Sequence, residues 1–144
     1  RPGRRGPLSH PPPSVTAMAV RARHPDHGEG GTAPHLALGA WGERLAERRY
    51  RTDGYRVLAR NWRCPSGEID LILGRGDLVV FSEVKTRSST AFGWPAEAVD
   101  RRRQARLWAV AATWIRSTGA RPGEVRFDVV SVLPGRVERL EGAF

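Results

Sequence analysis

The chain has 144 residues, which is enough for one folded domain and some additional length. Its formal net charge is +9, with 24 Lys and Arg against 15 Asp and Glu, so an anionic partner is the first expectation. Nucleic acid is the foremost polyanion, and an acidic membrane surface is the alternative. The single cysteine, Cys64, excludes an internal disulfide, and the longest apolar run, over 108–115, is too short to cross a bilayer. We therefore expect a cytoplasmic protein.

Residues 1–37 are rich in Pro, Gly, Arg and His. Such a stretch cannot bury enough apolar surface to offset its ordering entropy, so we expect a disordered tail over 1–37 and one folded domain over 38–144. The predicted domain holds 19 basic and 13 acidic side chains and is therefore basic without the tail. Met18 is the only methionine, so an over-extended gene start and a fragment are both open interpretations of the residues before it.

Hydrophobic periodicity and turn residues predict seven elements. They are a helix over 38–53, strands over 55–63, 68–73 and 78–86, a helix over about 96–118, and strands over 125–133 and 137–140. The short turn at 74–77 makes the second and third strands an antiparallel hairpin. The order α-β-β-β-α-β-β indicates an α/β fold with a mixed central sheet flanked by helices. In the second helix, Trp108 and Trp114 are both expected to belong to the core.

Lys85 is the only lysine in the chain, among 23 arginines. Arginine holds its proton too tightly to exchange it, whereas lysine is a compact charge whose pKa shifts readily on burial. Because arginine occupies all the remaining basic positions, the lysine at position 85 indicates a chemical role. The alternative is that one lysine has survived by chance in a biased sequence.

Ionisable side chains occupy alternate positions of the two hairpin strands, namely Glu68 and Asp70 on the first and Glu83 and Lys85 on the second. Because residues i and i+2 project from the same face of a strand, the four side chains can converge. Facing carboxylates are costly unless a cation neutralises them, and Mg²⁺ prefers oxygen ligands together with water. A lysine beside the metal can orient a hydroxide near a phosphate. The alternative is a solvated ion pair, with Glu68 holding the turn that precedes it.

Several short motifs follow one another at set intervals. They are Gly42-Glu43, Gly54-Tyr55, Asn61, Gly67-Glu68-Ile69-Asp70-Leu71, Glu83-Val84-Lys85-Thr86-Arg87, Phe92-Gly93, Pro95, Ala98-Val99 and Glu141-Gly142-Ala143-Phe144. In these motifs the region 38–144 resembles the YraN-type family of small bacterial proteins, which is related to the restriction-endonuclease-like, PD-(D/E)xK nuclease superfamily. The resemblance implies a restriction-endonuclease-like core and a metal-dependent site similar to that of Holliday-junction resolvases.

The resemblance also implies a role for each matching position. Asp70 would be the principal ligand of Mg²⁺ or Mn²⁺, Glu83 the second ligand, and the main-chain carbonyl of Val84 a further one. Glu43 matches the catalytic carboxylate of the first helix, and Lys85 matches the catalytic lysine. All four side chains are intact, which favours a competent site.

Basic residues surround the predicted site. Three successive arginines at the start of the second helix fan around its axis, so they cannot all pack against the sheet. Phosphate contact is one interpretation and a solvated face is the other. The candidate nucleic-acid contacts are Arg87, Arg101, Arg102, Arg103 and Gln104. Trp94 stands in a loop where relatives often carry a small or acidic residue, which would alter the groove.

These patterns favour a Mg²⁺-dependent endonuclease-like protein that hydrolyses phosphodiester bonds in DNA. No groove-reading element is recognisable, so the enzyme would be directed by nucleic-acid structure rather than by sequence. A homodimer would suit chemistry on two strands. The alternative from another class is a non-catalytic nucleic-acid-binding adaptor in a DNA-processing complex.

Overall fold

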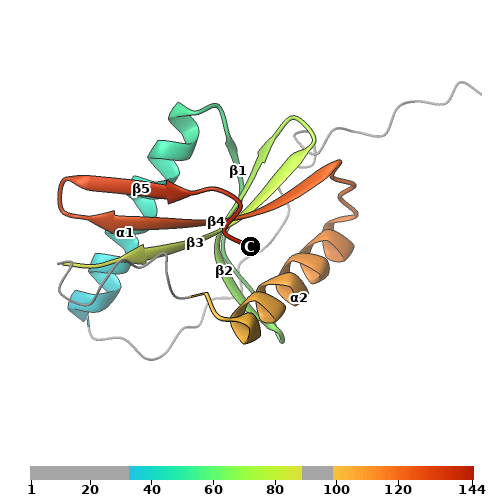
Figure 1. Cartoon of the computed structure of the whole chain (residues 1–144), viewed down its shortest axis with the longest axis horizontal. Helices are drawn as coiled ribbons and strands as arrows, with labels where there is room; N and C mark the ends of the chain where they lie inside the picture. Colours follow the sequence, from blue (N-terminus) through green and yellow to red (C-terminus); the bar gives the residue numbers. More distant parts are fainter. Residues whose placement is uncertain (1–32, 89–98) are drawn as a thin grey trace, which may run out of the picture.

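The computed structural model describes residues 33–88 and 99–144, which form two helices and five strands (Figure 1). The order of elements is α-β-β-β-α-β-β, as the sequence predicts. The elements are α1 (Ala33–Thr52), β1 (Arg56–Cys64), β2 (Gly67–Arg75), β3 (Leu78–Thr86), α2 (Arg101–Thr118), β4 (Glu124–Leu133) and β5 (Arg136–Leu140). None of the helices in these residues is long and apolar enough to cross a membrane.

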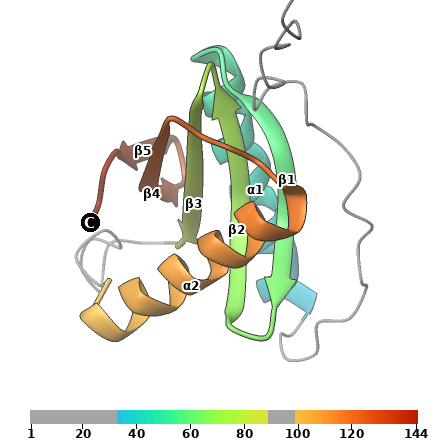
Figure 2. The same ribbon diagram turned by 90° about the vertical axis from the view of Figure 1, so that its right-hand side faces the viewer.

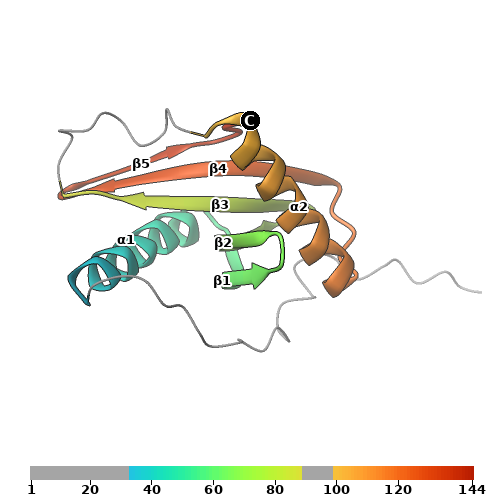
Figure 3. The same cartoon turned by 90° about the horizontal axis from the view of Figure 1, so that it is seen from below.

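The strands form one mixed sheet in the order β1-β2-β3-β4-β5. Neighbouring strands are antiparallel except β3 and β4, which are parallel and are connected through α2, as a parallel pair requires a crossover. Gly76, with a φ of 61°, makes the tight turn between β2 and β3. The two helices cover opposite faces of the sheet, α1 on one and α2 on the other (Figures 2 and 3). The central strands are therefore buried on both sides.

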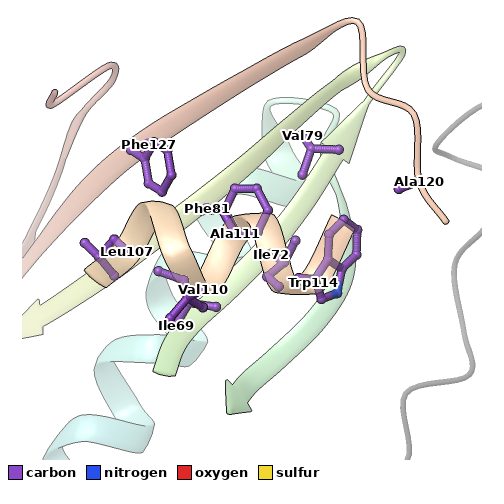
Figure 4. Close-up of a cluster of buried hydrophobic side chains, with 10 residues drawn as sticks. All are labelled: Ile69, Ile72, Val79, Phe81, Leu107, Val110, Ala111, Trp114, Ala120 and Phe127. Carbon is purple, nitrogen blue, oxygen red and sulfur yellow. The ribbon is translucent and has the colours of Figure 1, made fainter. Parts of the chain in front are cut away.

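One hydrophobic cluster lies between α2 and the sheet (Figure 4). Its aromatic rings join three elements, because the ring of Phe81 stacks on Phe127 at 5.6 Å and meets Trp114 edge-on at 5.7 Å. Its other members are Ile69, Ile72, Val79, Leu107, Val110, Ala111 and Ala120.

A second cluster lies between α1 and the opposite face of the sheet. It consists of Ala46, Tyr50, Tyr55, Leu71, Leu73, Leu78, Val80, Val130 and Val132. Since β3 contributes to both clusters, its run of apolar residues is typical of a strand covered on both faces.

A buried polar network lies beside the second cluster, on the face of the sheet that α1 covers. The Tyr50 hydroxyl donates to Asp128 Oδ2 at 2.8 Å and lies 3.0 Å from Ser82 Oγ. Arg126 donates to both carboxylate oxygens of Asp128 at 2.8 Å, and the main-chain N–H of Gly142 donates to Oδ1 at 3.1 Å. Burial and the negative charge of Asp128 raise the pKa of Tyr50 above its usual value, so the hydroxyl stays a donor. Asp128 thus ties α1, β4 and the C-terminal residues together.

Two helix starts differ from the prediction. The first helix begins at Ala33 rather than at 38, because Pro34 lies in the first turn, where its missing N–H needs no partner. The second begins at Arg101 rather than near 96. Asp100 has an extended backbone and accepts a hydrogen bond from Arg103 N at 2.8 Å, so it is the N-cap. Of the predicted tail over 1–37, residues 33–37 belong to α1, and residues 1–32 lie outside the described residues, as do the helical assignment of 96–98 and the loop containing Trp94.

The prediction that both tryptophans of α2 are core residues is wrong for one of them. Trp114 is 4% exposed, whereas Trp108 is 50% exposed. The buried stripe of α2 follows Leu107, Val110 and Trp114, and position 108 lies on its flank. There the indole ring contacts the ring of Phe127 at 4.5 Å and leaves its outer side in solvent.

We predict that Asp128→Ala lowers the free energy of unfolding by about 3–5 kcal/mol, because it leaves the partly buried Arg126 and the buried Tyr50 without their common partner. Chemical denaturation monitored by circular dichroism measures this. Glu138→Ala is the control, since Glu138 forms a surface pair with Arg136 and its loss should change stability by less than about 1 kcal/mol. Equal effects of the two substitutions would contradict the prediction.

Candidate active site

The pairing of β2 with β3 stops one residue before the predicted metal ligands. The last pair is Leu71 with Ser82, so a regular ladder would next place Asp70 opposite Glu83. Instead, the main-chain N–H of Val84 donates to Asp70 Oδ2 at 2.7 Å. Ile69 packs in the cluster under α2 and Leu71 in the cluster under α1, so the alternation of β2 is interrupted at Asp70. The Asp70 carboxylate therefore accepts the hydrogen bond that a main-chain carbonyl of β2 would accept in a regular ladder.

Negative charge outweighs positive charge around the Asp70 carboxyl. Burial raises its pKa to about 6, and the negative charges of Glu43 and Glu68 act in the same direction. The hydrogen bond from Val84 and the charge of Arg103 oppose this shift without cancelling it. A cation bound beside Asp70 would relieve the cost of ionising it.

Glu83 is 7% exposed and faces α2. Its Oε1 atom forms an ion pair with the guanidinium of Arg103, while its Oε2 atom is buried and has no hydrogen-bond partner within 33–88 and 99–144. An unsatisfied buried oxygen is costly, and such groups mark places where an ion or water belongs. Glu83 therefore has one oxygen that the surrounding protein leaves available.

The donor set suits a hard divalent ion that keeps most of its water. Within 33–88 and 99–144, no three His, Cys, Asp or Glu side chains gather as a metal site. Asp70 and Glu83 alone provide two carboxylates, and Mg²⁺ is commonly bound through one or two carboxylates together with water and substrate phosphates. Val84 contributes its N–H to the site, and the ligand role of its carbonyl stays a prediction.

Lys85 and Glu43 line one shallow hollow of about 370 Å³ at the end of β3, together with Arg87. Burial lowers the pKa of Lys85, and the nearby charge of Arg87 lowers it further. Burial also raises the pKa of Glu43, although the hydrogen bond from Asn61 partly offsets this and Glu68 adds to it. The structure thus brings the four predicted catalytic side chains to one end of β3, where their roles stay predictions.

Two residues with no assigned role in the sequence fix the position of Glu43. Asn61 Nδ2 donates to Glu43 Oε2 at 3.1 Å from a left-handed backbone with a φ of 46°, which is uncommon for a residue other than glycine. Gly42 packs directly against Thr86 of β3, where a Cβ atom would collide with the threonine side chain. Both residues belong to the motifs quoted above, and that membership was the signal available in the sequence. It would have indicated that Asn61 and Gly42 are needed for their backbone conformation or close packing.

The predicted nucleic-acid contacts occupy different settings. Arg101 and Arg102 are exposed at the start of α2, and Arg87 lies beside Lys85. Arg103 is the partner of Glu83. The Gln104 side chain donates to the carbonyl of Val99 at 3.0 Å and so stabilises the entry to the helix. Contact of these five residues with nucleic acid stays a prediction.

Comparison with known proteins identifies relatives over most of the chain. A family model described as "Uncharacterised protein family UPF0102" matches residues 42–132, which include all four predicted catalytic residues. A UPF0102 protein of Beutenbergia cavernae is 52% identical over 111 residues, which cover 74% of this chain and 94% of the relative. A UPF0102 protein of Frankia alni is 50% identical over 75% of this chain and 94% of its own length. One from Moorella thermoacetica is 47% identical over 72% and 87% respectively.

We predict that Asp70→Asn stabilises the metal-free protein at neutral pH. Because the pKa of Asp70 is raised in the folded state, the free energy of unfolding falls as pH rises from about 4 to about 6. An amide can still accept the Val84 bond without a charge, so stability at pH 7 should rise by roughly 1–3 kcal/mol. Urea denaturation with chelator at pH 4 and pH 7 measures this. A variant less stable than the parent at pH 7 would refute it.

We predict that Gly42→Ala lowers the free energy of unfolding by about 1–3 kcal/mol, because the new methyl group forces α1 away from Thr86. Gly39→Ala is a matched control in the same helix, since nothing lies within 4 Å of a Cβ atom there. That substitution should be neutral or stabilising by up to about 1 kcal/mol through helix propensity. Thermal unfolding of both variants measures this difference in stability. Similar melting temperatures for Gly42→Ala and Gly39→Ala would contradict the prediction.

Proposed function

The chain belongs to the UPF0102 family, and we propose that it is a Mg²⁺-dependent phosphodiesterase of the restriction-endonuclease-like superfamily that cleaves DNA. One observation carries the proposal, namely the Asp70 carboxylate that accepts the main-chain N–H of Val84, the residue next to Glu83, where the pairing of β2 with β3 has stopped. A structural carboxylate is expected to have a cationic or hydrogen-bonded complement, yet burial raises the pKa of Asp70, and Glu83 keeps one oxygen that has no hydrogen-bond partner among the described residues. Such a pair is suited to a divalent ion.

The residues around this pair support phosphodiester hydrolysis. Asp70 and Glu83 would hold the ion, with the Val84 carbonyl as a further ligand. When bound, Mg²⁺ polarises a phosphoryl oxygen and lowers the pKa of its bound water. Lys85 lies beside the same strand end with a lowered pKa, so its ammonium can orient the attacking water and stabilise the charge that develops on the phosphate.

Glu43 would act from the helix side of the hollow that it shares with Lys85. Asn61 donates a hydrogen bond to one of its oxygens, and burial raises the pKa of its carboxyl, which favours a role in proton transfer. Glu43 is thereby placed to orient water on the side of the hollow opposite β3.

DNA is the proposed substrate because the protein is strongly basic and exposed arginines lie beside the site. Arg87, Arg101 and Arg102 would contact phosphates, which position a nucleic acid without selecting its sequence. Recognition would therefore depend on the structure of the DNA. We further propose a cytoplasmic location and a homodimer, which would bring two sites to one substrate.

A non-catalytic nucleic-acid-binding adaptor is the second candidate, and one observation favours it. The ion pair between Arg103 and Glu83 neutralises part of the acidic pair without any metal. If that pair were permanent, the basic surface would remain functional while the metal ligands would be structural.

We predict that the protein cleaves branched or nicked DNA with Mg²⁺ or Mn²⁺, and that Asp70→Ala and Lys85→Ala each lower the rate by about 100-fold or more. Lys85→Arg should also lose cleavage activity, because the bulky guanidinium cannot replace a compact ammonium. Gel assays on branched, nicked and single-stranded DNA measure this, with the exposed Arg121→Ala as the control that retains activity.

The same panel separates the two candidates. DNA binding that persists in every variant, with no cleavage under either metal, would establish the adaptor instead. An absence of salt-sensitive DNA affinity would exclude both candidates.

A further inference from the structure

A second hollow, of about 260 Å³, lies on the α2 side of the site. Leu107 and Val110 form its apolar wall. Its polar groups are those of Ser66, Glu68, Arg103 and Arg106. The function proposed above does not use this hollow.

The charges of the hollow favour an anion. Arg103 and Arg106 are three residues apart on α2 and therefore share one face of the helix. Of the described residues that line the hollow, Glu68 is the one acidic side chain, and it forms an ion pair with Arg63 at 2.9 Å. Two guanidinium groups from α2 and a serine hydroxyl from the turn between β1 and β2 are a typical setting for a phosphate.

Arg103 connects this hollow to the acidic pair. The same guanidinium that lines the hollow is the ion-pair partner of Glu83 Oε1. Its side chain is 42% exposed, while that of Glu83 is only 9% exposed, so the arginine is the partner that can move. A divalent ion that uses Glu83 must compete with Arg103 for the carboxylate.

We propose that the hollow binds a phosphate of the nucleic acid through Arg103 and Arg106, and that this phosphate draws Arg103 away from Glu83. Release of Arg103 then frees the carboxylate for the divalent ion. The inference rests on the proposed function and adds an order of events, in which substrate completes the metal site. Because such coupling is reciprocal, nucleic acid raises metal affinity and metal raises nucleic-acid affinity by the same factor.

The test is Mn²⁺ binding to the full chain, followed by electron paramagnetic resonance of the free ion, without and with a short single-stranded deoxyoligonucleotide. Mn²⁺ bound by the oligonucleotide alone is subtracted. In the parent protein the oligonucleotide should raise Mn²⁺ affinity by about tenfold. In Arg103→Ala, Mn²⁺ affinity should already be raised by a similar factor without the oligonucleotide, and the oligonucleotide should add little.

Arg106→Ala has the opposite signature. It should weaken oligonucleotide binding while Mn²⁺ affinity in its absence stays unchanged, since Arg106 does not contact Glu83 in the described structure. Arg116→Ala removes the same charge from an exposed position farther along α2, which does not line the hollow, and should keep the full coupling. Circular dichroism verifies that each variant is folded.

Two results from the variants would overturn the inference. One is an Arg103→Ala protein whose Mn²⁺ affinity is unchanged or lower, and the other is an Arg116→Ala protein that behaves like Arg103→Ala. If the parent and Arg103→Ala both bind no Mn²⁺, the metal-dependent function fails together with the inference. If Mn²⁺ binds but the oligonucleotide does not affect it, only the inference fails.

Discussion

The candidate site depends on one hydrogen bond, from the main-chain N–H of Val84 to the side chain of Asp70. In a regular hairpin this N–H would bond to a main-chain carbonyl of β2, and the carboxylate would project from one face of the sheet. Because the side chain takes that place, β2 diverges from β3 and the carboxyl becomes buried. The divergence also exposes the end of β3 to both helices, so residues from α1 and α2 can reach the same few atoms.

The first helix is held at this end by close packing rather than by charge. Gly42 allows the backbone of α1 to approach Thr86, and Asn61 adopts a left-handed backbone that directs its amide to Glu43. Each feature has a cost that packing elsewhere must offset. Both serve to place Glu43, so the position of this carboxylate is the feature that unites them.

The sequence predicts the order of elements and most of the residues at the end of β3, because the apolar runs and the spacing of Asp70, Glu83 and Lys85 are local signals. It does not predict that β2 diverges at Asp70, since this depends on which hydrogen bond forms between two strands. Nor does it predict the ion pair of Glu83 with Arg103, which depends on the angle at which α2 crosses the sheet. The exposure of Trp108 is not predicted for a similar reason. An apolar residue on the flank of a helix is buried only if a neighbouring element covers it.

Two acidic residues of the sheet, Asp128 and Asp70, show how a structural role differs from a chemical one. Asp128 has a bidentate arginine, a tyrosine hydroxyl and a main-chain N–H, so every part of its charge is matched within the fold. Asp70 has one N–H, and its nearest charged neighbours include Glu43 and Glu68. Since a fold gains nothing in stability from an unmatched charge, the complement of Asp70 is best sought outside the chain, in a cation.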